Sequence, residues 1–403
     1  MKVLVFTHHL EIGGSQVNAI DLAAATRDIY GHEIVVFATP GPAAALVADR
    51  GLRLIEAPKP RAHPSPAMSR ALIAAVRREK PDVVHAWDWP QALDAYYGVH
   101  LPLRVPLAVS IMSMAVLTSV PQHIPITMGT EELVDEARRR RQGPVELLEP
   151  PVDTARDNPT AVDPSEFQQQ WGLDDSAVNV VVVSRLVKWL KQESLERAID
   201  AIELLAPEHT ARLVIVGDGS AAAELHSRAD AVNARLGRNA VILTGALIDP
   251  RPAYAAADVM IGMGGSILRG MAFGKPCIVL GEQGFSDVFE PSTAKMFFWQ
   301  GYYGLGDGDL SPEPLAHQLR RLVASPDLRA ELGRFSLDTI EQRYALAPLA
   351  ADLDALYRTT VDQRVARRVE WTEAARLGAR RFAGGALHFT RRAPAGAGGR
   401  TAS

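Results

Sequence analysis

Short runs of aliphatic and β-branched residues alternate with longer stretches of helical spacing along most of the chain, and this alternation restricts the fold more than any other feature. Strands are expected at 3–6, 34–37, 52–55, 83–85 and 107–110, and again at 180–183, 213–216, 241–243, 259–261 and 277–280. Helical spacing lies between them, for example at 17–28, 69–79, 194–205 and 221–236. Strand–helix alternation predicts an α/β protein whose parallel sheets are covered by helices on both faces.

A Pro-rich polar segment, Pro150 to Pro159, separates the two series of strands and is expected to link two domains. Each side is long enough for one doubly wound, Rossmann-like domain. We therefore predict an N-terminal domain at residues 1–155 and a C-terminal domain at 156–345. The single cysteine, Cys277, excludes an intramolecular disulfide and a Cys-rich metal site.

The chain carries no evident targeting or membrane segment. No apolar run approaches the roughly 20 residues that a membrane helix needs. The first strand lacks the longer apolar region and the small-residue cleavage site of a signal peptide. The expected location is the cytoplasm.

The charge is unevenly distributed along the chain. Residues 364–403 contain nine Arg and two Glu, a net charge of +7, so the rest of the chain carries about −11, since the total is −4. An acidic body predicts that nucleic acid is not a partner. The basic tail at 371–403 is expected to be a solvated, partly disordered terminus. The alternative is a weak peripheral contact with anionic lipid or with a partner.

A glycine-rich loop follows one strand in each half and precedes a helix. These loops are Gly13-Gly14-Ser15 and Gly262-Met263-Gly264-Gly265-Ser266. Glycine lets the backbone approach a ligand closely, Ser can cap the helix, and the free amides of a helix start favour an anion such as phosphate. The alternative for either loop is a tight turn without a ligand. Neither has the full glycine pattern of a dinucleotide site.

Two cations follow the strand at 180–183. Arg185 comes at its carboxyl end, and Lys191 follows six residues later, just before a helix. The forked guanidinium and the compact ammonium suit a diphosphate. The alternative is a pair of surface cations beside a loop. In the next turn, Gly217-Asp218-Gly219, we expect Asp218 to be structural.

Together these segments resemble the large group of retaining GT-B glycosyltransferases that includes glycogen and sucrose synthases and bacterial mannosyl- and N-acetylglucosaminyltransferases (glycosyltransferase family four-like). The resemblance covers residues 1 to about 345. Its motifs are Gly13-Gly14-Ser15-Gln16, Pro81-Asp82-Val83-Val84-His85-Ala86, Pro151-Val152-Asp153-Thr154, Val183-Ser184-Arg185-Leu186 with Lys191, Val216-Gly217-Asp218-Gly219, Leu243-Thr244-Gly245, Tyr254-Ala255-Ala256-Ala257-Asp258-Val259 and Met271-Ala272-Phe273-Gly274-Lys275-Pro276.

The resemblance implies two Rossmann-like domains that face each other across a cleft, with helices at about 345–370 packing back onto the N-terminal domain. It implies transfer of a sugar from a nucleotide-diphosphate-sugar with retention, without a metal or another cofactor, because side-chain cations and a helix start stabilise the leaving diphosphate. The implied diphosphate-binding residues are Arg185, Lys191, Gly264, Gly265, Ser266 and Ile267. Those near the base and ribose are Thr244, Gly245, Ala246 and Leu247, and those near the sugar or acceptor are Gly13, Gly14, Ser15 and Met112.

Three positions depart from the family pattern. Arg269 stands where relatives carry a glutamate that accepts hydrogen bonds from ribose; if Ser266 caps the helix, Arg269 is the third residue inside it. We hypothesise that Arg269 contacts the donor phosphates; the alternative is that it points to solvent. An upstream glutamate that reads the donor sugar is missing, and Glu282 is the candidate to replace it.

The third departure is Met112, which stands where relatives have a histidine near the reacting sugar. His9, with His8 beside it, and Asp88 are the candidates to take over catalytic or hydroxyl-binding roles. Their alternative roles are surface or capping positions. The aromatic segment 297–304 suits sugar or base stacking, or else packs beneath a loop.

The sequence therefore predicts a transferase that moves a sugar from a UDP- or GDP-sugar to a small-molecule, glycan or specialised-metabolite acceptor. One alternative is a nucleotide-sugar epimerase of the same architecture. The other is a catalytically degenerate protein that binds a nucleotide-sugar as a partner subunit.

Overall fold

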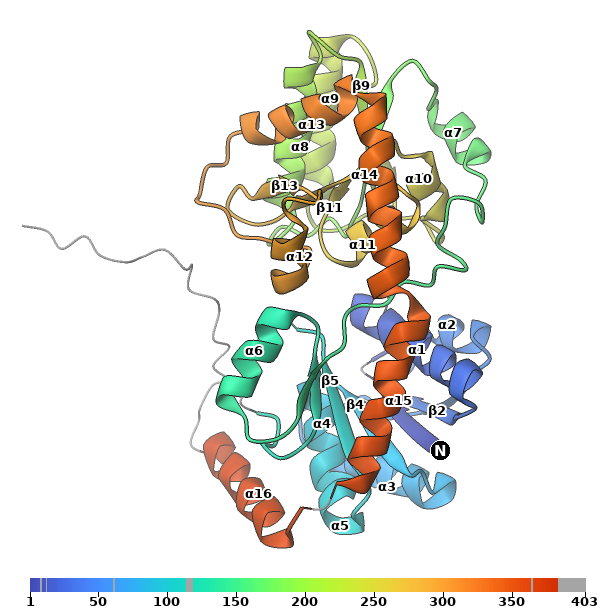
Figure 1. Cartoon of the computed structure of the whole chain (residues 1–403), viewed down its shortest axis with the longest axis vertical. Helices are drawn as coiled ribbons and strands as arrows, with labels where there is room; N and C mark the ends of the chain where they lie inside the picture. The colour runs from blue at the N-terminus through green and yellow to red at the C-terminus, as the bar shows by residue number, and fades with distance from the viewer. Residues whose placement is uncertain (8, 12, 61, 114–118, 364, 383–403) are drawn as a thin grey trace, which may run out of the picture. The chain divides into compact units, whose positions relative to one another are not determined.

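The computed structural model describes residues 1–382 except 8, 12, 61, 114–118 and 364 (Figure 1). The chain divides into two compact units, one comprising Met1–Pro151 with the segment from Leu346 onward, the other Val152–Ala345. The sequence placed this boundary at 155/156. The boundary lies earlier because Val152 already belongs to the second unit, where its amide donates to the Tyr344 carbonyl at 2.7 Å.

The sheet of the first unit is entirely parallel, with strand order β3-β2-β1-β4-β5-β6-β7. All five strands expected from the sequence are present. The additional β6 and β7 have three residues each, too few to form a pattern in the sequence. The strands are β1 Lys2–Phe6, β2 Glu33–Ala38, β3 Arg53–Glu56, β4 Val83–Trp87, β5 Leu107–Ile111, β6 Ile126–Met128 and β7 Val145–Leu147.

Two helices from the end of the chain complete the first unit. Helix α15 (Leu346–Asp362) packs along α1 (Gly14–Tyr30), and its Leu349, Leu353 and Tyr357 enter the same apolar core (Figure 1). The other helices of this unit are α2 Ala44–Asp49, α3 Pro66–Glu79, α4 Trp89–Ala95, the π-helical η1 Tyr96–His100, α5 Leu101–Leu103, α6 Glu131–Arg140 and α16 Arg367–Phe382.

Helix α16 includes residues 371–382, the first part of the tail that was expected to be solvated and partly disordered. Ala374 and Leu377 are buried, and the Tyr97 hydroxyl donates to the Ala374 carbonyl at 2.8 Å. The Ala- and Arg-rich composition resembles a solvated terminus, but the alanine and leucine supply an apolar stripe that packs on the first unit. Residues 383–403, the rest of the predicted tail, lie outside the described residues.

The second unit has the strand order β10-β9-β8-β11-β12-β13, parallel except for β13. All five strands expected here from the sequence are present, and β13 is additional. The strands are β8 Val178–Val183, β9 Ala211–Val216, β10 Val241–Gly245, β11 Val259–Gly262, β12 Cys277–Leu280 and β13 Ser286–Val288. The helices are α7 Ser165–Trp171, α8 Gln192–Leu205, α9 Ala222–Leu236, α10 Arg251–Ala256, α11 Gly265–Ala272, α12 Ala294–Gln300, α13 Glu313–Ala324, α14 Pro326–Thr339 and the π-helical η2 Ile340–Tyr344.

Each sheet has one point at which the strand order reverses, between β1 and β4 in the first unit and between β8 and β11 in the second. Open α/β sheets bind ligands beyond the carboxyl ends of the strands at such a switch point. The loops after these four strands are therefore where a site is sought. None of the described helices combines the length and the apolar character needed to cross a membrane.

Candidate functional site

The two cations predicted from the sequence lie at the switch point of the second unit. Arg185 is exposed two residues beyond β8, and Lys191 is half-buried immediately before α8. No described residue forms a hydrogen bond or ion pair with the Lys191 ammonium. Burial, and to a smaller extent the Arg185 charge, lowers the pKa of Lys191 to about 8. A half-buried ammonium without a counterion is suited to receive an anion.

A small pocket joins Lys191 to the glycine-rich loop. It lies between the ends of β8 and β11, the two strands at the switch point. The structure thus brings together two segments, after β8 and after β11, that are some 80 residues apart in the chain. The pocket is lined by Val182, Ser184, Lys191, Ser194, Leu195, Gly262, Met263 and Leu280.

The turn after β9 supports the loop that carries Arg185. A Cβ atom on Gly217 would lie 1.8 Å from the Ser184 carbonyl oxygen, and one on Gly219 would lie 2.4 Å from that of Leu186. Only glycine, which has no Cβ atom, fits where the turn passes these two carbonyl groups. The Asp218 carboxylate accepts a hydrogen bond from the Gly219 amide at 2.7 Å, which is a structural role.

The loop after β11 turns on glycines with positive φ, Gly262 at 151° and Gly264 at 61°. Helix α11 starts at Gly265 with Gly264 as its N-cap, and no side chain caps it. Ser266, a possible cap, does not cap this helix, because its hydroxyl donates to the Met263 carbonyl at 3.1 Å. Ile267 is fully buried in the core, so only its backbone could face a ligand.

Arg269 is the fifth residue of α11 rather than the third, because the cap lies at Gly264. Its Nε atom is 3.5 Å from the Asp157 carboxylate, and its side chain is 31% exposed. The structure thus gives Arg269 a carboxylate partner from the segment that begins the second unit. The phosphate contact hypothesised from the sequence stays a prediction.

The aromatic segment at 297–304 packs beneath a loop, the second of the two roles that the sequence suggested for it. The rings of Phe297 and Tyr302 are buried and stacked with their centroids 5.7 Å apart. The Tyr302 carbonyl accepts a hydrogen bond from the Gly264 amide at 2.6 Å. The cluster therefore supports the glycine-rich loop from within the second unit.

The residues predicted to contact the base, the ribose and the donor sugar fall into two separate groups. Thr244 and Gly245 end β10 and Ala246 and Leu247 follow it, whereas Glu282 follows β12 and accepts a hydrogen bond from the Tyr303 hydroxyl. Four strand spacings separate β10 from β12, about 19 Å at about 4.8 Å each. Glu282 and the Thr244 loop therefore lie on opposite sides of Arg185. If the base lies near β10, Glu282 is placed toward the sugar end of a donor.

In the first unit, the loop after β1 carries His9 and Gly13, and Gly14 and Ser15 begin α1. His9 Nδ1 lies 2.9 Å from the Glu11 carboxylate. Gly13 is the N-cap of α1, and the Ser15 hydroxyl is buried without a hydrogen-bond partner among the described residues. His8 lies outside the described residues.

Asp88 and Met112 lie beyond the neighbouring strands β4 and β5. Asp88 has φ 74° and ψ 169°, a region that is almost restricted to glycine and costs a non-glycine residue about 1–3 kcal/mol. Its amide donates to the Ser110 carbonyl at 2.7 Å, and its carboxylate accepts from the Trp89 amide at 2.9 Å. Met112 packs its side chain against the apolar core. Strained backbone of this kind gathers at functional sites.

The first unit also contains a histidine–aspartate pair that the sequence did not indicate. His63, in the loop that leaves β3, lies with its Nδ1 2.5 Å from the carboxylate of Asp94 on α4. Asp94 is fully buried and also accepts a hydrogen bond from the Ser65 amide, whereas 20% of the His63 side chain is exposed. The ring lies edge-on to Trp89, next to Asp88. The two residues are 31 positions apart, so no local motif indicates the pair.

A histidine held in this way has a fixed orientation. The carboxylate accepts from Nδ1–H, which leaves Nε2 to accept a proton or a hydroxyl hydrogen bond. Among the described residues, no three His, Cys, Asp or Glu side chains are grouped so that they could hold a metal ion.

Two Rossmann-like units, each with ligand-competent loops at its switch point, define the GT-B class of fold. Two family models match the chain, one described as glycosyltransferase family 4 over residues 12–123 and one as glycosyl transferases group 1 over residues 177–325. The chain belongs to the GT-B glycosyltransferases. No curated protein matches it significantly in sequence.

Solved structures agree with this fold over nearly the whole chain. A glycosyltransferase from Rickettsia africae superposes with a TM-score of 0.72 at 12% identity, covering 90% of this chain and 99% of that one. HepE of Anabaena in complex with UDP and glucose gives 0.68 at 17% identity, covering 89% and 100%. Starch synthase IV of Arabidopsis thaliana bound to ADP and acarbose gives 0.63 at 12% identity, covering 90% and 100%. At these identities the likeness is one of fold.

Proposed function

We propose that the protein is a retaining, metal-independent glycosyltransferase that uses a nucleotide-diphosphate-sugar. The observation that carries this proposal is the set of groups at the switch point of the second unit. The half-buried, unpaired Lys191 ammonium shares a pocket with the loop at Gly262–Met263, and Arg185 leaves the neighbouring strand. An anion with the charge of a diphosphate complements these groups.

The relatives support a uridine nucleotide as the first choice of donor. HepE was crystallised with UDP, with UDP and glucose, and with UDP-glucose, and starch synthase IV with ADP. We therefore place UDP-sugars first among UDP- and GDP-sugars. The loop at Thr244–Leu247 would lie beside the base, and Glu282 would lie beside the sugar.

In the proposed reaction, Arg185 and Lys191 neutralise the charge that develops on the leaving diphosphate. Preorganised cations and helix amides do this without reorganisation in the transition state. The diphosphate in turn keeps Lys191 protonated, since a neighbouring negative charge raises the pKa of an ammonium. Retention would follow if the acceptor attacks from the face that the diphosphate leaves, with the diphosphate taking the acceptor proton.

On the acceptor side, the first unit offers a hydroxyl-binding set rather than cations. His63 with its Nε2 available, the strained Asp88 and the His9 loop all follow carboxyl ends of strands in one sheet. Imidazole nitrogens and carboxylates accept hydrogen bonds from hydroxyls. We propose a hydroxyl-bearing acceptor: a small molecule, glycan or specialised metabolite.

Thermal denaturation with UDP-, GDP-, ADP- and dTDP-sugars tests the donor site, because a ligand of the folded state raises its stability. We expect stabilisation by one nucleotide class, lost in Arg185→Ala. Release of nucleoside diphosphate with a panel of acceptors, in the presence of a chelator, then tests transfer, and the anomeric configuration of the product tests retention. Binding without nucleotide release on any acceptor would indicate a nucleotide-sugar-binding protein, and conversion of the donor sugar itself would indicate an epimerase.

A further inference from the structure

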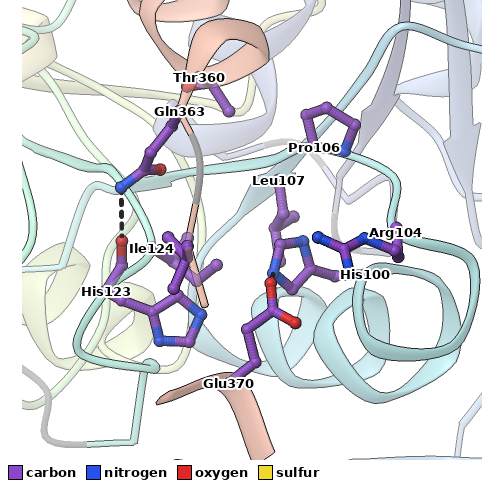
Figure 2. A pocket seen from close by; sticks show the side chains of 10 residues that line it. His100, Arg104, Pro106, Leu107, His123, Ile124, Thr360, Gln363 and Glu370 are labelled. Atoms are coloured by element: carbon purple, nitrogen blue, oxygen red, sulfur yellow. Dashed lines mark hydrogen bonds and ion pairs between the residues drawn. The ribbon is translucent and has the colours of Figure 1, made fainter. Parts of the chain in front are cut away.

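A second pocket lies in the first unit, at the edge of the sheet opposite to the proposed acceptor loops (Figure 2). Its wall includes Leu107, the first residue of β5, and Ile124, which precedes β6. Helix α16 closes one side with Glu370. The pocket has a volume of about 230 Å³. None of the residues assigned to the donor or acceptor lines it.

Two histidines in this pocket have ring nitrogens without partners. His123 is 8% exposed, and neither of its ring nitrogens has a hydrogen-bond partner among the described residues. His100 Nδ1 lies 2.9 Å from the Val105 carbonyl, whereas its Nε2 is buried and unpartnered. Because a carbonyl can only accept, Nδ1 carries the hydrogen and Nε2 presents a lone pair. Buried polar atoms without a partner are costly, and those that line a pocket can be satisfied by a polar ligand.

Burial keeps both rings neutral at neutral pH. Desolvation lowers the pKa of His123 to about 4, and it also lowers that of His100. Two neutral imidazoles together offer lone pairs to a donor and at least one N–H group to an acceptor.

Two opposite charges share the pocket without pairing with each other. The Glu370 carboxylate is buried, and its contact is a long one, 3.9 Å to His100 Nε2. The Arg104 guanidinium at the exposed side has no ion-pair partner among the described residues. Figure 2 shows the Arg104 and Glu370 side chains extending toward the same His100 ring. Since they form no ion pair, both charges remain available to a ligand.

We propose that this pocket binds a small zwitterion carrying an ammonium and a carboxylate, of the α-amino acid class. The ammonium would donate to Glu370 and to His100 Nε2. The carboxylate would accept from Arg104 and from the N–H group of His123. Glu370, Arg104, His100 Nε2 and the His123 N–H group then each have a complementary partner, whereas a neutral polyol would supply no opposite charge to Glu370 or to Arg104.

A bound zwitterion would also connect α16 to the rest of the first unit. Glu370 belongs to α16, whereas His100 and Arg104 flank α5 near the start of β5. Ligand binding would therefore stabilise the docked position of α16. This site is independent of the proposed nucleotide-sugar site, because it shares no residue with it.

Thermal denaturation and calorimetry of the full chain with the common L-amino acids test the proposal. We expect at least one to raise the melting temperature at about 10 mM and its N-acetyl and carboxamide derivatives to have no effect, since each derivative lacks one charge. Glu370→Gln and Arg104→Gln should each weaken binding at least about tenfold. Arg368→Gln, on the exposed face of α16, is the matched control and should bind as wild type.

Three outcomes would overturn the proposal. The first is no stabilisation by any amino acid, and the second is equal stabilisation by the N-acetyl or carboxamide derivative. The third is stabilisation by Zn²⁺ alone that is lost in His100→Ala, which would make the pocket a metal site. Nucleotide-sugar binding is measured on the same variants, so that a failure here is distinguished from a failure of the proposed glycosyltransfer.

Discussion

The carboxyl edges of the two sheets are built by different means. At the edge of the second unit, glycines set the path of the backbone and two cations face the pocket or solvent. At the edge of the first unit, the candidate groups are side chains held by other side chains or by strained backbone, as in the His63–Asp94 pair and at Asp88. The edge of the second unit suits an anion of invariant shape. The edge of the first unit can be adapted to a particular acceptor.

The difference extends to how each edge tolerates change. Gly217 and Gly219 cannot gain a Cβ atom without meeting a neighbouring carbonyl oxygen. The His63 side chain, by contrast, is 20% exposed and can be replaced without such an overlap, whereas Asp94 also holds the Ser65 amide. We therefore expect substitutions at the edge of the second unit to lower activity with all substrates. Substitutions at the edge of the first unit should change only the use of the acceptor.

The largest expected effect is the loss of the switch-point cations. Arg185→Ala and Lys191→Ala should each lower kcat/KM by about 10²–10³, because each removes charge stabilisation of the leaving diphosphate. Lys188→Ala is the matched control, since Lys188 is exposed in the same loop and pairs with Glu224. Nucleoside diphosphate release is the measurement. Equal activity of the Lys188 and Lys191 variants would remove Lys191 from the donor site.

The next effect concerns the backbone of the same edge. Gly217→Ala should lower the free energy of unfolding by about 3 kcal/mol or more, because its Cβ would overlap the Ser184 carbonyl oxygen. Gly172→Ala is the control: Gly172 also has a positive φ, 63°, but no atom lies within 4 Å of an added Cβ. We expect it to cost only about 1 kcal/mol. Urea denaturation compares the two variants. A similar loss in the free energy of unfolding would show that Gly217 is not in tight contact with the Ser184 carbonyl oxygen.

A smaller and more selective effect is expected at the carboxyl edge of the sheet in the first unit. His63→Gln should lower kcat/KM for the acceptor by about 10- to 100-fold and leave donor binding unchanged, because the ring would contact only the acceptor. Asp94→Asn should act in the same direction, since it removes the carboxylate that orients the ring. A change in donor affinity in His63→Gln would contradict the division of labour between the edges.

The buried ammonium also predicts a pH dependence. Lys191 has a pKa of about 8 in the folded protein, below its ordinary value of 10.5, so the unfolded chain binds more protons between these values. Its burial therefore costs stability below about pH 8, and the cost is relieved as the pH rises toward 10.5. Lys191→Met should raise the melting temperature at pH 7 and have less effect at pH 10. In the wild type, donor affinity should fall as the pH rises through about 8, and the opposite trend in either measurement would argue against a desolvated ammonium.

The sequence predicted ten of the strands because buried parallel strands produce continuous apolar runs. Three were missed, and β6, β7 and β13 have only three residues each. The position of Arg185, Lys191 and the glycines in the second unit was equally predictable from the sequence. They lie at strand ends, and the strand order follows from doubly wound topology.

The side-chain pairs that the sequence did not predict depend on tertiary contacts between distant segments. The pairing of His63 with Asp94 requires the β3–α3 loop to meet α4, and the partner of Arg269 comes from the segment that begins the second unit. For the cap of α11 the sequence offered Ser266 as one possibility, since Ser is a common cap, whereas the structure has Gly264 there.

The smallest expected effect sharpens the comparison at Arg269. Its guanidinium lies 3.5 Å from Asp157 and both side chains are only partly exposed, so the pair should contribute about 1 kcal/mol or less to stability. If the pair is the role of Arg269, Arg269→Ala and Asp157→Asn will lower the melting temperature by similar small amounts and leave the donor dissociation constant within about twofold. Arg269→Lys should retain part of the stability, because it keeps the charge and loses the fork. A loss of donor affinity in Arg269→Ala that Asp157→Asn does not share would instead place Arg269 on the donor phosphates. The edge of the second unit would then hold three cations rather than two.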